Sequence, residues 1–275
     1  MEDNNRKLSS DESSLMSINE LLKNNDQYLL NIIHDLRSHL NVITSAAQFM
    51  EHNYKDDKNL KYIEIIKRNS FKMLKLINNL IDSNKIKNNY YKLNKKNIDI
   101  VPMIENTISC IEKFASERNI NLIFDTNEEE CIMAIDPEAI DRVIMNLLSN
   151  AIKFSNENSN IYINLVVKDK EIELSFKDEG CGISKEEKER IFDRFYQGKN
   201  NDNIEGWGIG LNLCMIFVKA HDGKIFLESE INKGSIFTVI LPRKIEEHIE
   251  TVKEEGNLIN KNQAVEIEFS DTYKF

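Results

Sequence analysis

Glycine is absent from the first 179 residues of this 275-residue chain, and six of its nine glycines lie between Gly180 and Gly210. Glycine gives the backbone conformations that other residues rarely adopt. A sequence that avoids glycine and then concentrates it in one stretch indicates a local use for that freedom. The glycine-rich stretch is therefore a first candidate for a functional site.

Other absences exclude whole classes of protein. No apolar run approaches the length of about 18 residues that a membrane-spanning helix needs, and the polar, acidic start MEDNNRKLSSDESS is unlike a signal peptide. The net charge of −10 argues against binding to nucleic acids and to anionic membrane surfaces. The cysteines form no CxxC pair and have no histidine at metal-ligand spacing, which is typical of reduced thiols. We expect a cytoplasmic protein with no membrane span in this chain.

The N-terminal part of the chain has the apolar pattern of long helices. A heptad seam, with alternating steps of four and three residues, is formed by Leu29, Ile33, Leu36, Leu40, Ile43, Ala47 and Met50. After a turn at residues 53–58, a second stripe is formed by Ile63, Ile66, Met73, Ile77 and Leu80. Two such helices form an antiparallel hairpin, and a second hairpin is needed to complete a four-helix bundle. We expect residues 14–88 to form a homodimer, preceded by a polar tail at 1–13.

The pattern changes after a predicted linker at residues 89–97. Helices are predicted at 102–119, 137–154 and 210–220, and strands at 120–125, 131–136, 161–167, 171–178, 224–229 and 235–242. This mixture is typical of an α+β sandwich with helices on one face of one sheet. The acidic tail at 244–275 ends in alternating Val265, Ile267 and Phe269, so we expect an added edge strand there, with disorder as the alternative.

Two glycine motifs, DEGCGI at 178–183 and GWGIGL at 206–211, are candidates for binding phosphate. The second motif opens directly onto an apolar helix, whose N-terminus can face an anion. Neither motif fits the dinucleotide fingerprint or the P-loop. For a single cluster of this kind, a tight turn without a ligand is the commoner explanation.

A third feature lies on the predicted helix 137–154. Asn146 and Asn150 share a face of that helix, and Lys153 lies near the same face. Two amides and an ammonium group on an otherwise apolar helix are costly unless they have partners. An amide oxygen can ligate Mg²⁺ and a lysine can bind phosphate, although asparagine pairs on helices are usually solvated.

His34 does not belong to the buried stripe of its helix. With His34 at zero on a helical wheel, the seam lies between about 180° and 260°, Ser38 at about 40° and Asp35 at about 100°. An exposed imidazole can attack a phosphoryl group when a carboxylate fixes its tautomer and takes up its proton. For any one residue, an ordinary solvated histidine is the commoner case.

Five segments occur in a fixed order, namely DLRSHLNVI after His34, NLLSNAIKF, DEGCGIS, RIFDRFYQ and GWGIGL. Together they resemble the sensor histidine kinases of bacterial two-component systems, over roughly residues 14–243. The resemblance implies a phosphoacceptor hairpin followed by an α/β-sandwich ATP-binding domain at 98–243, of the type shared by histidine kinases, gyrase and a heat-shock chaperone. It implies ATP as substrate, Mg²⁺ as cofactor and a response regulator receiver domain as partner, and it leaves room for an upstream sensor protein.

The resemblance also implies roles for individual residues. His34 matches the phosphoacceptor, Asp35 the acid that orients it, and Ser38 a position that helps place water for dephosphorylation of the regulator. Asn150 matches the Mg²⁺ ligand, with Asn146 and Lys153 close to the phosphates. The rest of the nucleotide site is matched by Phe154 and Asp178 at adenine, Gly180 and Gly182 around them, the lid arginine Arg194, and Gly206, Gly208 and Gly210 at the triphosphate. Residues 197–205 would form the mobile lid.

His39 departs from the family, which usually has proline five residues after its phosphoacceptor. Proline would kink this helix, and in the family that kink is associated with bending during signalling. At about 140° on the wheel, His39 borders the buried stripe. Packing beside the seam is a commoner role for such a residue than pH sensing or accepting phosphate. The difference bears on switching and on dephosphorylation rather than on His34.

The sequence therefore predicts an ATP-dependent protein-histidine kinase that autophosphorylates His34 and passes the phosphoryl group to an aspartate of a response regulator. Dephosphorylation of that regulator is a second activity consistent with the resemblance. Two alternatives stay open at this point. One is a clamp-type ATPase related to the gyrase and chaperone domains, and the other is an ATP-binding scaffold without phosphotransfer.

Overall fold

The computed structural model describes residues 36–37, 40–50, 57–87, 92–198, 207–248 and 258–272. The chain divides into two compact units, residues 1–87 and 88–275. The division falls where the sequence changes from a heptad pattern to mixed strands and helices.

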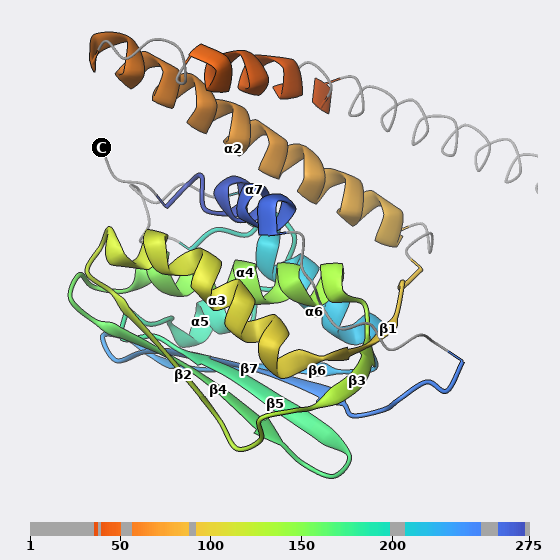
Figure 1. Cartoon of the computed structure of the whole chain (residues 1–275). Coiled ribbons are helices and arrows are strands. Elements are labelled where there is room, and N and C mark those ends of the chain that lie inside the picture. Colours follow the sequence, from red (N-terminus) through yellow and green to blue (C-terminus); the bar gives the residue numbers. More distant parts are fainter. Residues whose placement is uncertain are drawn as a thin grey trace, which may run out of the picture. The chain divides into compact units, whose positions relative to one another are not determined.

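The first unit contains a helical stretch at residues 40–50 and helix α2 (Asp57–Lys87). The Arg37 guanidinium donates a hydrogen bond to the Asn78 side-chain oxygen, so the two helices lie side by side (Figure 1). The predicted turn at 53–58 overlaps the start of α2, and residues 51–56 lie outside the described part of the chain. The described part of this unit is an antiparallel hairpin, as the sequence predicted.

The predicted seam of the first helix separates into two rows. Leu40 and Ala47, seven residues apart, are buried, whereas Leu36, Ile43 and Met50 are exposed. The second stripe divides in the same way, since Ile63 and Ile77 on α2 are buried while Ile66 and Met73 are 44% and 49% exposed. Each helix therefore presents one buried apolar row and one exposed apolar row.

The second unit is built on a five-stranded sheet with the order β2-β4-β5-β7-β6. Its strands are β2 (Asn121–Thr126), β4 (Asn160–Val167), β5 (Glu171–Lys177), β6 (Lys224–Glu230) and β7 (Gly234–Pro242). Strands β2 and β4 are parallel, and the other neighbours are antiparallel.

A separate two-stranded sheet differs from the single sheet that the sequence predicted. It pairs β1 (Lys96–Asp99), which includes the last residues of the expected linker, with β3 (Ile132–Ile135). The backbone N–H of Ala134 in β3 donates to the carbonyl oxygen of Lys244, at 2.7 Å. Both edges of β3 are therefore engaged away from the five-stranded sheet.

Helices cover one face of the five-stranded sheet, as predicted (Figure 1). They are α3 (Ile100–Ser116), α4 (Pro137–Phe154) and α6 (Gly210–Ala220), and a one-turn helix α5 (Lys185–Lys188) follows β5. Alternate strand side chains are fully buried, among them Ile161, Ile163, Ile172, Leu174, Phe176 and Val239. These residues and the apolar faces of the three longer helices form the core of this unit.

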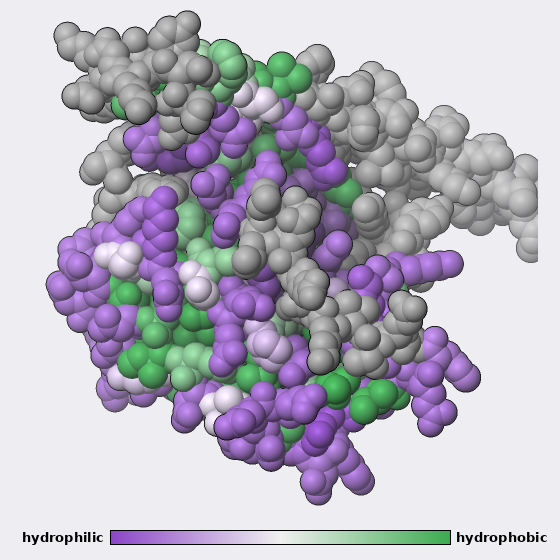
Figure 2. Space-filling view, viewed as in Figure 1, coloured by the Kyte–Doolittle hydropathy of each residue, from purple (hydrophilic) through white to green (hydrophobic). Residues whose placement is uncertain are grey.

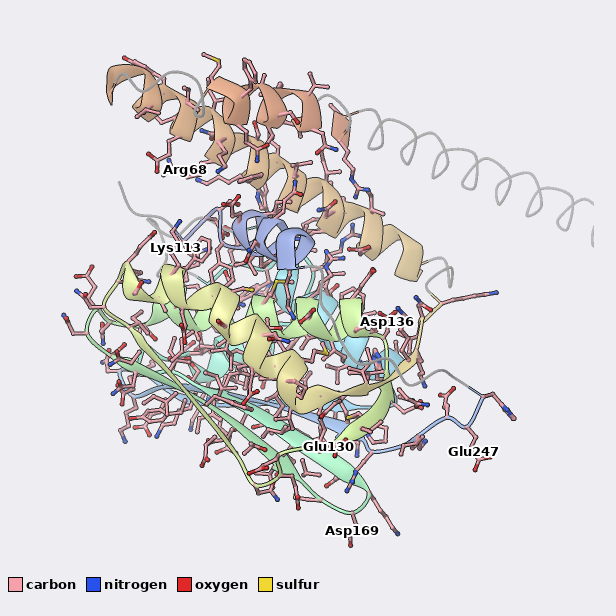
Figure 3. All side chains as sticks on the ribbon, viewed as in Figure 1. Arg68, Lys113, Glu130, Asp136, Asp169 and Glu247 are labelled. Carbon is pink, nitrogen blue, oxygen red and sulfur yellow. The ribbon has the colours of Figure 1, made fainter. Side chains whose placement is uncertain are left out.

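Helix α4 begins and ends at the predicted residues, with a local capping signal at its start and a contact from a distant residue at its end. The Asp136 side chain accepts the backbone N–H of Ala139 at 3.2 Å, and Pro137 occupies the first helical position, where a missing N–H has no cost. Figure 3 shows Asp136 at this end of the helix. At the other end, the Arg118 guanidinium donates to the backbone oxygens of Lys153 and Ser155, at 3.1 and 3.0 Å.

A buried histidine joins α6 to the start of α4. His221 follows α6, its Nδ1 lies 2.7 Å from the carbonyl oxygen of Phe217, and its Nε2 accepts the backbone N–H of Asp136 at 3.0 Å. Burial lowers the pKa of His221. A neutral imidazole can donate through one nitrogen and accept through the other, so this residue holds the two helix ends together.

The predicted C-terminal edge strand is wrong. Residues Leu258–Glu268 form helix α7, which packs on α3 and α4 (Figure 1). Val265 and Phe269 are 1% and 0% exposed, whereas Ile267 between them is not buried. A spacing of four places two side chains on one face of a helix, so the apolar alternation suggested the wrong period.

The polarity of the helices and of the surface completes the description of the fold. Within the described residues, each helix is too short or too polar to cross a bilayer. Figure 2 shows a mainly hydrophilic face with smaller apolar areas.

Candidate functional site

The polar face of α4 is assembled as the sequence predicted. The Asn150 side-chain Nδ2 donates to the Asn146 Oδ1, at 3.3 Å. Asn146 is 9% exposed, and the Lys153 side chain is 10% exposed. Asn146 and Lys153 therefore lie in a shielded environment, where electrostatic interactions are stronger than in water.

The second glycine motif lies against this face. A Cβ atom built at Gly210 would lie 2.3 Å from the Asn146 Nδ2, so the start of α6 and the amide of Asn146 are in direct contact. Ile209 provides no side-chain cap for α6, and the first N–H groups of a helix without a cap are available to an anion. Gly208 accepts the backbone N–H of Phe195 at 2.7 Å, and Gly206 lies outside the described residues.

The first glycine motif is joined to the end of α4. Ser155 and Gly180 form an isolated antiparallel bridge, and the Cys181 N–H donates to the carbonyl oxygen of Phe154 at 3.4 Å. Gly182, with φ +68°, lies against the Glu230 carbonyl. The half-buried Phe154 and the DEGCGI turn are therefore neighbours, as an adenine pocket would require.

Asp178 is a buried carboxylate at this turn, with 5% of its surface exposed. Its Oδ1 accepts the backbone N–H groups of Gly180 and Ser235, at 2.9 and 3.1 Å. Burial raises the pKa of Asp178, and the two hydrogen bonds lower it by less. The two described hydrogen bonds both use Oδ1, so Oδ2 is the atom that can accept from a ligand.

The structure does not bring Arg194 to the face of α4. Its guanidinium stacks on the Phe195 ring at 4.7 Å, and its Nε is buried without a hydrogen-bond partner. Residues 199–206, which include most of the predicted lid, lie outside the described part of the chain. The proposed contact of Arg194 with phosphate stays a prediction.

Sequence reasoning missed the acidic partners of the α4 face. The Glu268 carboxylate accepts a hydrogen bond from Asn146 Nδ2 at 3.2 Å, and the Lys153 ammonium pairs with the Asp271 carboxylate at 3.0 Å. It also missed Arg118, which binds the last carbonyls of α4. The four-residue spacing of Val265 and Phe269 was the signal that could have indicated a helix near these acids.

Comparisons with known proteins agree with this geometry. Residues 135–245 match the family described as "Histidine kinase-, DNA gyrase B-, and HSP90-like ATPase", and residues 24–89 match the "His Kinase A (phospho-acceptor) domain". The sensor histidine kinase WalK of Bacillus subtilis is 29% identical over 227 residues, which cover 80% of this chain and 37% of WalK. The chain belongs to the sensor histidine kinases. The family that the sequence motifs resemble is thereby confirmed.

Solved structures show the same fold. ShkA, solved at full length in complex with AMPPNP, has a TM-score of 0.68 at 19% identity, covering 89% of this chain and 54% of ShkA. The histidine kinase ThkA, in complex with the response regulator protein TrrA, has a TM-score of 0.52 at 25% identity, covering 78% of this chain and 60% of ThkA. The chain spans less than two thirds of the curated kinases it matches, 37% of WalK and 61% of SasA from Crocosphaera subtropica among them.

The residues on this face of α4 fit a nucleotide and Mg²⁺. The glycine turn at Gly210 leaves no room for a side chain beside Asn146, and the donors of the α4 face already hold two anionic groups. Within the described residues, no group of three or more His, Cys, Asp and Glu could hold a metal. A Mg²⁺ ion here would therefore take an amide oxygen together with phosphate oxygens, which suits the preference of Mg²⁺ for oxygen and for substrate phosphates.

The phosphoacceptor candidates lie outside the described residues. His34, Asp35, Ser38 and His39 are all in this group, while Leu36 and Arg37 are helical. Their roles rest on the sequence and on the family match at 24–89.

Proposed function

We propose that this chain is an ATP-dependent protein-histidine kinase, which phosphorylates His34 and passes the phosphoryl group to an aspartate of a response regulator. The observation that supports this most directly is the face of Asn146, Asn150 and Lys153 against the glycine turn of α6. It occurs in a chain whose residues 24–89 match the phosphoacceptor family. That match is also the reason why a clamp-type ATPase or a scaffold without phosphotransfer is not favoured.

The residues of the second unit bind and orient ATP. Asp178 accepts from the adenine amino group through Oδ2, Phe154 lines the base, and Lys153 offsets phosphate charge. The uncapped N-terminus of α6 faces the triphosphate. A Mg²⁺ ion held by Asn150 and the phosphates supplies further charge neutralisation when it is bound.

The residues of the hairpin accept the phosphoryl group. His34 Nε2 attacks the γ-phosphorus and forms an N–P bond, while the bond from that phosphorus to the β,γ-bridging oxygen breaks and ADP leaves. The Asp35 carboxylate holds Nδ1–H and takes up its proton, which keeps the imidazole nucleophilic. The phosphoryl group then moves to the carboxylate of a receiver aspartate, and Ser38 places water for the later hydrolysis of that aspartyl phosphate. Catalysis is mainly positioning and electrostatics.

The proposal includes partners and a location. The exposed rows of the hairpin support a homodimer, in which a second copy covers them. The complex of ThkA with the response regulator protein TrrA supports a receiver domain as phosphoryl acceptor. A cytoplasmic location, with input from an upstream sensor protein, belongs to the same proposal.

Labelling with [γ-³²P]ATP and Mg²⁺, at saturating ATP, tests this function. We expect the wild-type chain to take up label that is stable to base and labile to acid, as a phosphohistidine is. His34→Gln should lose the label, and the matched control His248→Gln, which changes an exposed histidine, should keep it. An unlabelled wild-type chain, or equal labelling of His34→Gln, would contradict the proposal. Steady ATP turnover without a phosphoenzyme would instead favour the clamp-type ATPase.

A further inference from the structure

We propose that the C-terminal segment, residues 258–272, is an intramolecular competitor of ATP that covers the phosphate side of the nucleotide site. This segment consists of α7 and the turn after it. The inference rests on the proposed function and adds a means of regulation to it.

The segment places two carboxylates on the groups that would bind phosphate. The Glu268 Oε1 lies 3.2 Å from the Asn146 Nδ2, and the Asp271 Oδ2 lies 3.0 Å from the Lys153 Nζ. The side chains of Lys153 and Asp271 are only 10% and 9% exposed. The carboxylates therefore provide the kind of anionic oxygen that a triphosphate would offer, and the Lys153–Asp271 pair is shielded from water.

Apolar contacts hold the segment in this position. Val265 and Phe269 are 1% and 0% exposed, and the Phe269 ring lies 5.0 Å from the Phe114 ring of α3. Val265 lies on α7, which packs against α3 and α4, and Phe269 follows the helix directly, with its N–H bonded to the Val265 carbonyl oxygen. Docking of the segment buries these apolar side chains, so the cover has a driving force besides its charges.

An ion pair ties the first half of α7 to α4. The Lys261 ammonium lies 3.1 Å from the Asp141 Oδ1, and the two side chains are 9% and 17% exposed. The Thr107 hydroxyl donates to the same Asp141 oxygen at 2.6 Å. The segment is thus fixed at two places along α4, near Asp141 and near Lys153.

Charge repulsion prevents ATP from binding while the C-terminal segment is docked on α4, which is the closed position. Lys153 can offset a phosphate or the Asp271 carboxylate, but a triphosphate next to both Asp271 and Glu268 would place like charges together where solvent is scarce. ATP should therefore bind only when the segment has moved away. The apparent affinity for ATP is then the affinity of the open form multiplied by the fraction of molecules that are open.

Glu268 could instead help to bind the nucleotide, and this role predicts the opposite change in affinity. If Glu268 helped Asn150 hold Mg²⁺, removal of its charge would weaken nucleotide binding. A cover predicts that the same change strengthens binding. The sign of one affinity change therefore separates the two roles.

Nucleotide titration of the full chain and three variants tests the inference. Trp207 is the single tryptophan of the chain and is 53% exposed. It stands next to Gly208, so energy transfer to N-methylanthraniloyl-ATP with Mg²⁺ reports binding directly. The variants are a chain that ends at His248, the double variant Glu268→Gln with Asp271→Asn, and the control Glu247→Gln. Glu247 is exposed, and Figure 3 shows it on the chain after β7, away from α7.

We expect the shortened chain to bind the nucleotide at least about tenfold more tightly than the full chain, which corresponds to an open fraction of at most about a tenth. The double variant should also bind more tightly, by a smaller factor, and the control should match the full chain. The double variant keeps the apolar anchors, so it tests the charges even if removal of the segment destabilises α3 and α4.

Equal affinity of all four chains, or weaker binding by the double variant, would overturn the inference and leave the proposed function standing. No binding by any chain, the shortened one included, would overturn both the inference and the proposed function. Amide hydrogen exchange gives a second measurement on the full chain. Added ADP and Mg²⁺ should speed exchange in residues 258–269, whereas slower exchange there would contradict competition.

Discussion

Two glycines of the site show that a missing side chain has different uses. A Cβ atom at Gly182, where φ is +68°, would lie 2.0 Å from the backbone oxygen of Glu230. At Gly210, the Cβ atom would instead meet the side chain of Asn146, at 2.3 Å from its Nδ2. A side-chain amide can turn away, and a backbone carbonyl within a sheet cannot. Substitution at Gly182 should therefore affect folding, and substitution at Gly210 should affect the site.

The variant Gly210→Ala should bind nucleotide about tenfold more weakly, which is the effect of losing roughly one hydrogen bond. The added methyl group displaces the Asn146 amide from the start of α6. Thermal stability should fall slightly, by about 1 kcal/mol, because the shift breaks or strains the hydrogen bonds of the buried Asn146 amide with Asn150 and Glu268. Nucleotide titration and thermal unfolding check both parts, and unchanged affinity would remove Asn146 from the site.

The variant Gly182→Ala should lower the free energy of unfolding by at least about 2 kcal/mol, since it combines left-handed strain with a backbone clash. Cys181→Ala, one residue away at an exposed position, is the matched control and should change little. Urea titration measures both. If the two variants were equally stable, the close approach of Gly182 to Glu230 would not limit this position.

The carboxyl of Asp178 should give the site a characteristic pH dependence. Burial raises its pKa in the folded state, so its contribution to the free energy of unfolding is largest in acid and is lost as the pH rises through that raised pKa. Asp178→Asn carries no charge at any pH. The variant should therefore gain stability relative to the wild type between acid and neutral pH, while it loses nucleotide affinity. Urea titrations across this range test the sign, and parallel curves for the two proteins would contradict it.

At the scale of elements, the hairpin explains why a heptad pattern predicted two interfaces. Leu40 and Ala47 belong to a buried row, and the exposed rows include Ile43 on the first helix and Ile66 and Met73 on α2. The spacing of seven within each row is what a four-helix bundle requires. The exposed rows are thus the part of the pattern that one chain leaves uncovered.

The variant Met73→Glu should shift the proposed dimer toward monomer, because it places a charge in the row that a second copy would bury. Met73 is 49% exposed in the single chain, so the fold of the hairpin itself should tolerate the change. Sedimentation velocity measures the shift, with Met73→Leu as a control that should stay dimeric. Dimers of equal stability in both variants would place the interface elsewhere.

The elements that the sequence predicted well are those with local signals. The α4 helix was predicted to the residue, because Asp136 and Pro137 mark its start. The α7 helix was predicted as a strand, because Val265, Ile267 and Phe269 fit a period of two as well as Val265 and Phe269 fit a period of four. Only packing on α3 and α4 decides between those periods, and packing is not visible in a short pattern.

At the scale of the whole molecule, some residues of the site could be predicted from the sequence and others could not. Asn146, Asn150 and Lys153 could be predicted together because one helix carries all three. Glu268 and Asp271 lie 122 and 118 residues from their partners on α4. Contacts over such separations depend on the tertiary fold, and acidic residues in an acidic tail gave no sign of them.

In the proposed function, the two units carry complementary halves of one reaction. The second unit holds the groups for ATP, and the first unit contains the sequence with His34 and Asp35. The proposed kinase activity therefore requires transfer of a phosphoryl group from the nucleotide to that one histidine. The C-terminal segment adds a barrier to nucleotide binding, which saturating ATP or removal of the segment should overcome.

Mapping of the phosphorylated peptide tests this central claim most directly. Cleavage after Lys23 and Arg37 releases NNDQYLLNIIHDLR, in which His34 is the one histidine and serine and threonine are absent. After incubation of the full chain with saturating ATP and Mg²⁺, mass spectrometry at neutral to basic pH should find this peptide phosphorylated on His34, and brief acid treatment should remove the group. An unmodified peptide 24–37, with phosphate on another peptide or on none, would contradict the account.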